Sequence, residues 1–596
     1  MKRKFSAADS QTMLGGAMVL TMSIALVKII GLVYKLPLAN AITVEGMGYF
    51  HSAYEIYLPI LAIAIAGLPI AVSRMVSQRY STGRFHDVRA IRHVARRLYW
   101  FTGGVGTLLI ILLAYPYAYY SSSGGLESLP AIFAIAPTVF FCCAMAAYRG
   151  YYEGMRNMVP TAASQVIEAL CKLVIGLALA ILVMRIGQNE FAAHGTVFGR
   201  AADCIDTANS MLYPWAAAAA IMGITLGSIF GLIYLWARFR KHGDGITPEQ
   251  LRLSPPPERK RKLLREMFVM AIPMVISSSI LNLTNFIDAF IVQRQLRTLL
   301  LNHPETIENI YGAAFASAGT LPENRAIYIW GVYSIAMTFR TLIPTVIAAL
   351  GMSSLPVIAA AWEQRRRDTI QHTINTVLRM TMMIALPAGF GMAVLARPIM
   401  ELFYGRNNPG MYVHAAPILV IFGIFTALMA LSMPVVNILQ GIGRMDIPVK
   451  TLIAGMFVKI GVNYFLVRNP YINIAGAAVG TVLFFIVVVG INLFMLLRVT
   501  KTKVKINSVL IKPLFCACLS AATAWLMSSL AARLLPGMLD STRMVLLGQI
   551  VLATGFAAAV YGISMLFTRA VGEEDLQMLP GGKKIAKVLA KFKLLG

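Results

Sequence analysis

Residues 68–79, LPIAVSRMVSQR, set the organisation of the whole chain, because a related stretch, LPVIAAAWEQRR, occupies residues 355–366. The two stretches are 287 positions apart. The same offset relates two further pairs of residues: Gly154 with Gly441, and Lys172 with Lys459. Three separated points that share one offset indicate an internal repeat. In a membrane protein, a repeat of this size is the mark of a transporter whose two lobes rock around a midplane site.

The composition is that of a membrane protein. Of the 596 residues, 58% are hydrophobic and 13% are charged, whereas a soluble domain carries about 25% charged residues. Apolar runs long enough to cross a bilayer recur from Met13 to Phe567. This excludes an ordinary cytosolic enzyme and predicts an all-α polytopic membrane protein with fourteen spans. The spans are expected near 13–38, 48–73, 98–118, 129–148, 159–186, 212–236, 267–293, 327–360, 380–396, 412–439, 447–467, 471–497, 510–532 and 544–568.

Basic residues orient these spans. The net charge of +27 comes mostly from short segments between apolar runs, which fits membrane topology better than a nucleic-acid partner. With the N-terminus inside, 38 Lys and Arg residues fall in inner segments and nine in outer ones. We therefore predict that both termini lie in the cytoplasm.

The repeat and the loops divide the chain into five parts. These are an N-terminal lobe (1–236), a basic cytoplasmic linker (237–266), a C-terminal lobe (267–497), a pair of helices (498–568) and a basic tail (569–596). Because six spans separate equivalent points, the repeat is expected to be parallel. A solvated anchor beside acidic lipid headgroups explains the charge of the linker without a specific partner.

Each charge inside a span needs a partner, a water-filled cavity or a function, because it costs at least about 2.5 kcal/mol to insert. The basic ones are Lys28, Lys35, Lys172, Arg185, Arg340 and Lys459, and the acidic ones are Glu55, Glu168 and Asp288. This cationic balance favours an anionic substrate such as a diphosphate. Glu168 and Lys172, spaced i, i+4, either neutralise one another or line a cavity.

The seventh span carries a polar stripe of Ser278, Asn282, Asn285 and Asp288. We expect it to face the bundle interior and to contact a sugar, a peptide or a coupling ion. Hydrogen bonding between helices is the alternative interpretation. The sequence contains no GxxxxGK[ST] loop and no HExxH, which argues against ATP hydrolysis and zinc peptidase chemistry. No cofactor is expected, and the work must come from an Na+ or H+ gradient, the membrane potential or the substrate's own gradient.

The segment GLPIAVSRMVSQRYSTGRFHDVRAIRHVARR, its echo in the second half, the turns GMRNMVP and GIGRMDIP, and the fourteen spans resemble the multidrug/oligosaccharidyl-lipid/polysaccharide (MOP) exporter superfamily. Within it, the chain looks most like the polysaccharide biosynthesis group of stage V sporulation protein B and the MurJ-type lipid II flippases. The resemblance covers about residues 10–568.

The resemblance implies a V-shaped fold of two six-helix lobes, with two C-terminal helices beside a groove for a lipid tail. It also implies that undecaprenyl-diphosphate-linked saccharides are turned to the outer leaflet by alternating access, in partnership with the cell-wall synthesis machinery. By position, Lys28, Lys35 and Arg340 would contact the diphosphate, and Lys172 and Lys459 would support the cavity. The chain departs from the group in its second span, which has no cation before Arg74.

Three alternatives stay open. A cation-coupled multidrug antiporter of the same superfamily would use Asp288. An integral-membrane glycosyltransferase would need a catalytic acid or base in the outer segments 187–211 or 298–326, where no recognisable constellation occurs. A structural scaffold would not need the charges in the spans.

Overall fold

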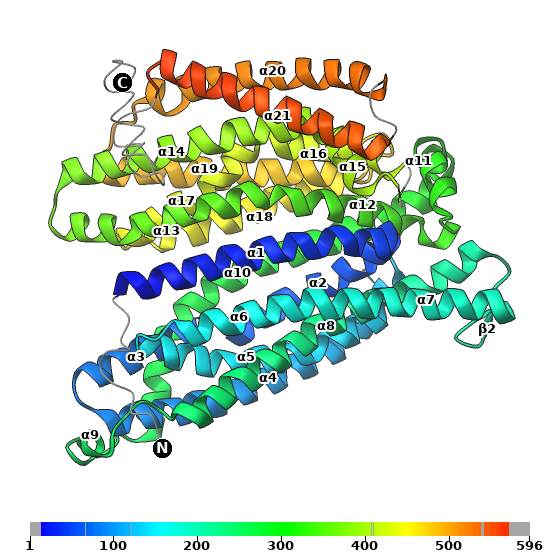
Figure 1. Ribbon diagram of the computed structural model, residues 1–596. Coiled ribbons are helices and arrows are strands. Elements are labelled where there is room, and N and C mark those ends of the chain that lie inside the picture. Colours follow the sequence, from blue (N-terminus) through cyan, green and yellow to red (C-terminus); the bar gives the residue numbers. More distant parts are fainter. Residues whose placement is uncertain are drawn as a thin grey trace. The chain divides into compact units, whose positions relative to one another are not determined.

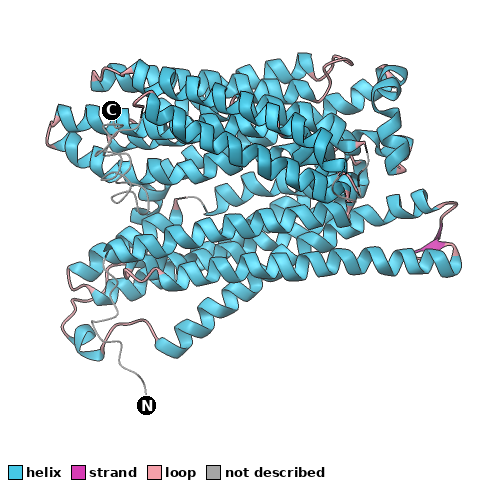
Figure 2. Cartoon of the chain, turned by 45° about the horizontal axis from the view of Figure 1, so that its top comes forward, coloured by secondary structure: helices cyan, strands magenta, loops and turns pink. Residues whose placement is uncertain are grey.

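A computed structural model describes residues 13–65, 67–120, 122–406, 408, 410–537 and 541–570. Within these residues the chain is helical apart from its turns, its loops and one short hairpin, β1 (Thr196–Val197) and β2 (Arg200–Ala201), which pair antiparallel (Figure 2). The prediction of an all-α protein is confirmed. The basic tail lies almost entirely outside the described residues.

Twelve helical segments within the described residues are long and apolar enough to cross a membrane. A thirteenth is formed if α16 (Met411–Ile424) and α17 (Thr426–Gly441), which meet at an angle of 48°, make one bent span. Together they correspond to the expected spans, apart from 267–293. That span falls within α10 (Lys260–Asn302), some of whose side chains lie outside the described residues. The chain is a multi-pass membrane protein.

The helices form two compact units (Figure 1). Unit 1 holds the described residues up to Ile307 together with Gly319–Gly331, and unit 2 holds Glu308–Ala318 and the described residues from Val332 onward. Helices wholly in unit 1 are α1 (Met13–Ala41), α2 (Thr43–Ile65), α3 (Leu68–Ser81), α4 (Phe85–Tyr120), α5 (Leu129–Gly154), α6 (Val159–Cys171), α7 (Leu177–His194), α8 (Ile205–His242), α9 (Pro248–Arg252) and α10. Those of unit 2 are α13 (Leu342–Glu363), α14 (Arg367–Val394), α15 (Ala396–Tyr404), α16, α17, α18 (Asp446–Leu466), α19 (Ala475–Thr500), α20 (Lys512–Leu534) and α21 (Thr542–Phe567). Two helices are divided between the units: α11 (Pro304–Ala318) and α12 (Arg325–Arg340).

The units divide the chain differently from the predicted lobes, because α10 belongs to unit 1 rather than to the second half. It packs against α2, α3 and α4. Its fully buried Gln293 accepts hydrogen bonds from the Ser52 hydroxyl and the Ser123 amide, both at 3.0 Å, and donates to the Tyr117 hydroxyl at 3.2 Å. A buried amide with three partners fixes a helix position more specifically than apolar contact does.

The repeat is visible in the turns that follow α5 and α17. Both helices end at the repeat-related glycines, Gly154 and Gly441. Arg156 and Gly443, also 287 positions apart, both have left-handed φ angles of 59° and 79°. The equivalent hydrogen bonds from Asn157 N to Tyr152 O and from Arg444 N to Leu439 O both measure 2.9 Å. The two halves therefore build the same turn.

The halves differ at the LP motif itself. Gly67 has a φ of 76° and precedes α3, whose first turn contains Pro69. This left-handed conformation suits glycine, which has no Cβ to clash. Ser354 occupies the equivalent position in the second half, and α13 runs through it without interruption. The first half therefore interrupts its helix before the motif, and the second half does not.

The predicted linker is docked on unit 1 by ion pairs. Asp87, which is 1% exposed, contacts Arg84 at 2.6 Å, and its other carboxylate oxygen accepts a 2.7 Å hydrogen bond from the Glu258 amide. The Glu258 carboxylate in turn contacts Arg84 at 3.0 Å and Arg79 at 3.4 Å, and Arg79 reaches Glu266 at 2.9 Å. Although burial opposes it, the hydrogen bond from Lys262 and the two arginine charges lower the pKa of Glu258. We call these residues the linker clasp.

Candidate substrate site

Lys172 is the cation whose surroundings the structure defines most fully. Its Nζ donates a 3.0 Å hydrogen bond to the Tyr54 hydroxyl and lies 5.0 and 5.3 Å from the ring centres of Tyr34 and Tyr54. An ammonium group has three N–H donors. The described residues provide one hydrogen-bond acceptor and two aromatic faces, which leaves donors for a further ligand.

Local backbone geometry positions this side chain. Lys172 opens a single π-helical turn, Lys172–Gly176, between α6 and α7. Such turns are rare and occur frequently at functional sites. Gly176 allows the turn to approach α8, because a Cβ there would lie 2.8 Å from the Ala220 carbonyl oxygen. That carbonyl also accepts a 3.1 Å hydrogen bond from the Tyr34 hydroxyl, which fixes one of the two rings beside Lys172.

The second ring belongs to an aromatic row on α2. Phe50, Tyr54 and Tyr57 follow at helical spacing, with ring centres 5.0 and 5.9 Å apart. Tyr34 of α1 extends the row, 6.2 Å from Phe50. Ring pairs at these separations stabilise one another. These rings therefore form one fixed side of the space around the Lys172 ammonium.

The structure brings three predicted cations of unit 1 together. Lys35 is half-buried and lies within Coulombic range of Lys172, Glu55 and Lys28. Lys28 itself is exposed on α1. Glu168 also lies within Coulombic range of Lys172, so three cations and two carboxylates share one region, and its balance is net positive, as expected from the sequence.

Glu168 pairs with Arg149, a partner that the sequence did not indicate. The Arg149 Nη2 lies 3.1 Å from the Glu168 Oε2, and the Arg149 Nε donates to the Ser164 hydroxyl at 2.9 Å. The i, i+4 spacing of Glu168 and Lys172 suggested a local pair. In the structure the hydrogen bond of Lys172 goes to Tyr54 instead.

Arg340 and Lys459 lie in unit 2, and each faces an aromatic ring. The half-buried Arg340 guanidinium is 5.5 Å from the ring centre of Phe422. Lys459, only 4% exposed, has its Nζ 5.8 Å from the ring centre of Phe484. A ring face attracts a cation and replaces part of its hydration.

The polar stripe lies on α10. Asn282 is half-buried, Asn285 is exposed and Asp288 is 7% exposed. The side chain of Ser278 is outside the described residues. The three described side chains therefore differ in exposure, and their contact with a substrate or ion stays a prediction.

Sequence reasoning missed three residues that shape these surroundings, Tyr34, Tyr54 and Arg149, and one buried acid elsewhere in unit 1, Glu45. Tyr54 had a usable signal, because aromatic residues recur along one face of the second span. Glu45 is buried and accepts a 3.2 Å hydrogen bond from Asn324, which follows it by 279 residues. No local pattern indicates a partner so distant.

A family model described as "Polysaccharide biosynthesis protein" matches residues 13–362, more than half of the chain. The chain belongs to this polysaccharide biosynthesis family. A MatE model also matches residues 330–465, and both families fall within the MOP superfamily that the sequence resembles.

Relatives of this chain include two proteins from Bacillus subtilis (strain 168). The chain is 23% identical to its lipid II flippase MurJ over 492 residues, covering 80% of this chain and 81% of the relative. It is 22% identical to its stage V sporulation protein B over 578 residues, covering 96% and 98%.

Solved structures share the fold. A lipid II flippase MurJ in an inward closed conformation matches with a TM-score of 0.58 and 14% identity, covering 93% of this chain and 99% of the other. An inward-facing multidrug resistance MATE family transporter matches with a TM-score of 0.54 and 16% identity, covering 78% and 94%. The chain is thus a MOP-family transporter or flippase by its relatives and its fold.

Proposed function

We propose that this protein translocates an undecaprenyl-diphosphate-linked saccharide, lipid II or a related cell-envelope precursor, across the bacterial cytoplasmic membrane by alternating access. The observation that carries the proposal is the environment of Lys172. Its ammonium is hydrogen-bonded to a neutral hydroxyl and faces two rings. Among the described residues it forms no ion pair with a carboxylate. Such a cation is available to an anionic headgroup.

The charge balance supports a diphosphate substrate. Lys28, Lys35 and Lys172 share one region of unit 1, and unit 2 separately contains Arg340 and Lys459. A diphosphate carries several acceptor oxygens, and lysine and arginine are the usual ligands of such groups. The names of the B. subtilis relatives agree with a lipid-linked saccharide. Both termini would then lie in the cytoplasm, as the basic inner segments require.

A cation-coupled multidrug antiporter is the second candidate. It is favoured by the MatE match over residues 330–465 and by the burial of Asp288, a carboxylate in α10. An exporter of organic cations would depend on that carboxylate rather than on the lysines. The Lys172 environment favours the anionic substrate.

Rescue of cells depleted of their lipid II flippase tests the proposal. Wild-type protein should restore growth, and Lys172→Ala and Arg340→Ala should not at matched membrane levels. Arg185→Gln is the control, because Arg185 is exposed on α7. Equal rescue by all four forms would contradict the proposed site. Dye efflux that depends on Asp288 would favour the antiporter.

A further inference from the structure

Unit 1 contains a small hollow between α4 and α5, away from Lys172. It is lined by Arg92, His93 and Arg96 of α4 and by Ala147 and Tyr148 of α5. These helices pack along their length and α8 packs beside α5 (Figure 1). We call this feature the α4–α5 pocket.

The exposed face of α4 changes character at the pocket. His93 and Arg96 are exposed, and one turn further along the helix Trp100 and Phe101 are 55% and 70% exposed. The exposed residues that follow, as far as Leu113, include many that are large and apolar. A helix face that passes from basic through aromatic to aliphatic residues marks the headgroup level of a bilayer.

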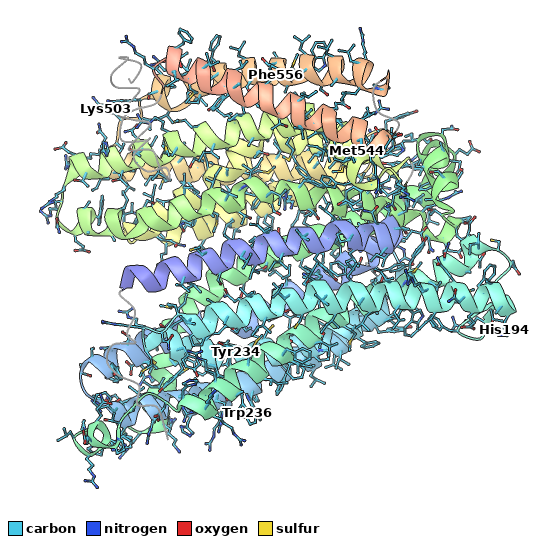
Figure 3. The ribbon with its side chains drawn as sticks, viewed as in Figure 1. His194, Tyr234, Trp236, Lys503, Met544 and Phe556 are labelled. Carbon is cyan, nitrogen blue, oxygen red and sulfur yellow. The ribbon has the colours of Figure 1, made fainter. Side chains whose placement is uncertain are left out.

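The same transition occurs on α8. Trp236 is 44% exposed, and the guanidinium of Arg240, one turn later, lies 4.2 Å from its ring centre. Figure 3 shows Trp236 and Tyr234 on this helix. Tryptophan beside a basic residue is the usual arrangement at a membrane interface. Two helices of unit 1 thus place the headgroup level at the pocket.

Within the described residues, no ion pair neutralises the two arginines of the pocket, although Asp244 lies within Coulombic range of Arg92. Three nearby arginines do have carboxylate partners. Arg79 of α3 and Arg84, in the turn after α3, pair with Glu258 of the linker clasp, and Arg89 of α4 pairs with Asp244. The described residues form no such pair with Arg92 or Arg96. The paired arginines explain the docking of the linker. In the described structure the guanidinium groups of Arg92 and Arg96 have no ion pair, so their N–H donors are available to an anionic ligand.

Two side chains of the pocket are held in position by neighbouring groups. The Arg92 guanidinium lies 4.2 Å from the ring centre of Phe239, and its Nε is buried without a hydrogen-bond partner in the described structure. His93 is oriented by its own helix, because its Nδ1 lies 2.8 Å from the Arg89 carbonyl oxygen and must donate to it. This leaves Nε2 for another contact.

We propose that the α4–α5 pocket binds the phosphate of an anionic phospholipid headgroup. Arg92 and Arg96 supply the charge and N–H donors, His93 and Tyr148 supply further polar contacts, and the apolar face beyond Trp100 accommodates the acyl chains. Arginine clusters at the headgroup level recognise phosphate esters in this way. The site is separate from the proposed substrate site, so either can be correct without the other.

Native mass spectrometry of the detergent-purified full chain tests this site. The probes are dioctanoyl phosphatidylglycerol, dioctanoyl phosphatidylcholine and inorganic phosphate. Arg96→Gln is the main variant, because this exposed side chain can be changed without disturbing the core. A second variant, Arg92→Lys, retains the charge but loses the planar guanidinium that donates paired hydrogen bonds. Arg97→Gln is the matched control, since Arg97 is an exposed neighbour that does not line the pocket.

We expect the wild type to retain phosphatidylglycerol in preference to phosphatidylcholine. Arg96→Gln should weaken this retention by more than about fivefold, because it removes a direct contact in addition to the attraction of one basic residue near a headgroup. Arg92→Lys should weaken it measurably. Arg97→Gln, which removes only the general attraction, should weaken it less than Arg96→Gln does. Equal losses in Arg96→Gln and Arg97→Gln, or equal retention of both lipids, would overturn the proposal. Displacement of the lipid by an equal concentration of inorganic phosphate would assign the pocket to a soluble anion and overturn the lipid assignment.

Discussion

The Nζ atom of Lys172 lies 3.0 Å from the Oη atom of Tyr54, a residue 118 positions earlier in the chain. This contact joins α2 to the π-helical turn after α6 and gives a charge in a membrane span a neutral partner. A carboxylate would have cancelled the charge, whereas a phenol hydroxyl only orients it. The contact therefore fixes the position of the lysine without supplying an opposite charge.

The first prediction concerns the charge of Lys172. Lys172→Met should reduce transport of a lipid-linked diphosphate at least tenfold, because a hydrogen bond to a charged group contributes about 1.5 to 3 kcal/mol. Tyr54→Phe should reduce it less, since the cation remains. Initial rates in membrane vesicles at matched protein levels measure both effects. Lys172→Arg should retain part of the activity, and a rate equal to that of Lys172→Met would show that charge is not what the site supplies.

The second prediction concerns the partner of Glu168. A double-mutant cycle between Arg149→Met and Glu168→Gln should give a coupling energy of about 1 to 2 kcal/mol, because the two groups are 3.1 Å apart and mostly buried. The cycle between Glu168→Gln and Lys172→Met should give less than about 0.5 kcal/mol. Unfolding of the detergent-solubilised protein supplies the free energies. If the coupling energy between Glu168 and Lys172 were the larger of the two, the local i, i+4 ion pair would be the correct interpretation.

The third prediction concerns Asp87 in the linker clasp. Asp87→Asn leaves Arg84 without its 2.6 Å partner, and breaking a buried pair from one side is strongly destabilising. We expect the free energy of unfolding to fall by about 2 to 3 kcal/mol, since Arg84 is partly exposed. Asp446→Asn is the control, because its pair with Arg444 is exposed and should contribute less than about 1 kcal/mol. Similar losses in both variants would argue against a structural role for the clasp.

The fourth prediction concerns pH. Because the folded protein lowers the pKa of Glu258, the unfolded chain binds the proton more tightly, and protonation favours unfolding. The contribution of Glu258 is therefore complete above its ordinary pKa of about 4.3 and is lost as the pH falls through the lowered value. Melting temperatures of wild type and Glu258→Gln should differ at pH 7 and converge towards pH 3. A difference that does not shrink between pH 7 and pH 3 would rule out the carboxylate charge as its cause.

The sequence predicted the helices well because one physical signal, apolar length, determines them. It predicted the repeat because matching motifs share one offset, and the structure adds that Arg156 and Gly443, at that offset, take the same left-handed turn in both halves. It assigned α10 to the second half because chain order suggested so, whereas the fully buried Gln293 bonds to Ser52 and Ser123 of the first.

The candidate site was predicted in part. Polarity alone identified Lys28, Lys35 and Lys172, and the structure places them together. It could not identify Tyr54 or Arg149 as partners, because those contacts depend on how α2, α5 and α6 pack. The local rule for Glu168 and Lys172 was outweighed by an arginine 19 positions from Glu168. Charges in spans are readable from a sequence, and their partners depend on tertiary structure.

The central claim is most directly tested by reconstituting the purified protein into liposomes that contain a fluorescent undecaprenyl-diphosphate-linked saccharide. A membrane-impermeant reagent then quenches only the outer leaflet, so that the fraction of substrate moved between leaflets is measured over time. We predict rapid exchange with wild-type protein, little with Lys172→Met, and wild-type rates with the exposed-site control Arg185→Gln. Equal rates for protein-free liposomes and wild type, or for wild type and Lys172→Met, would contradict the account.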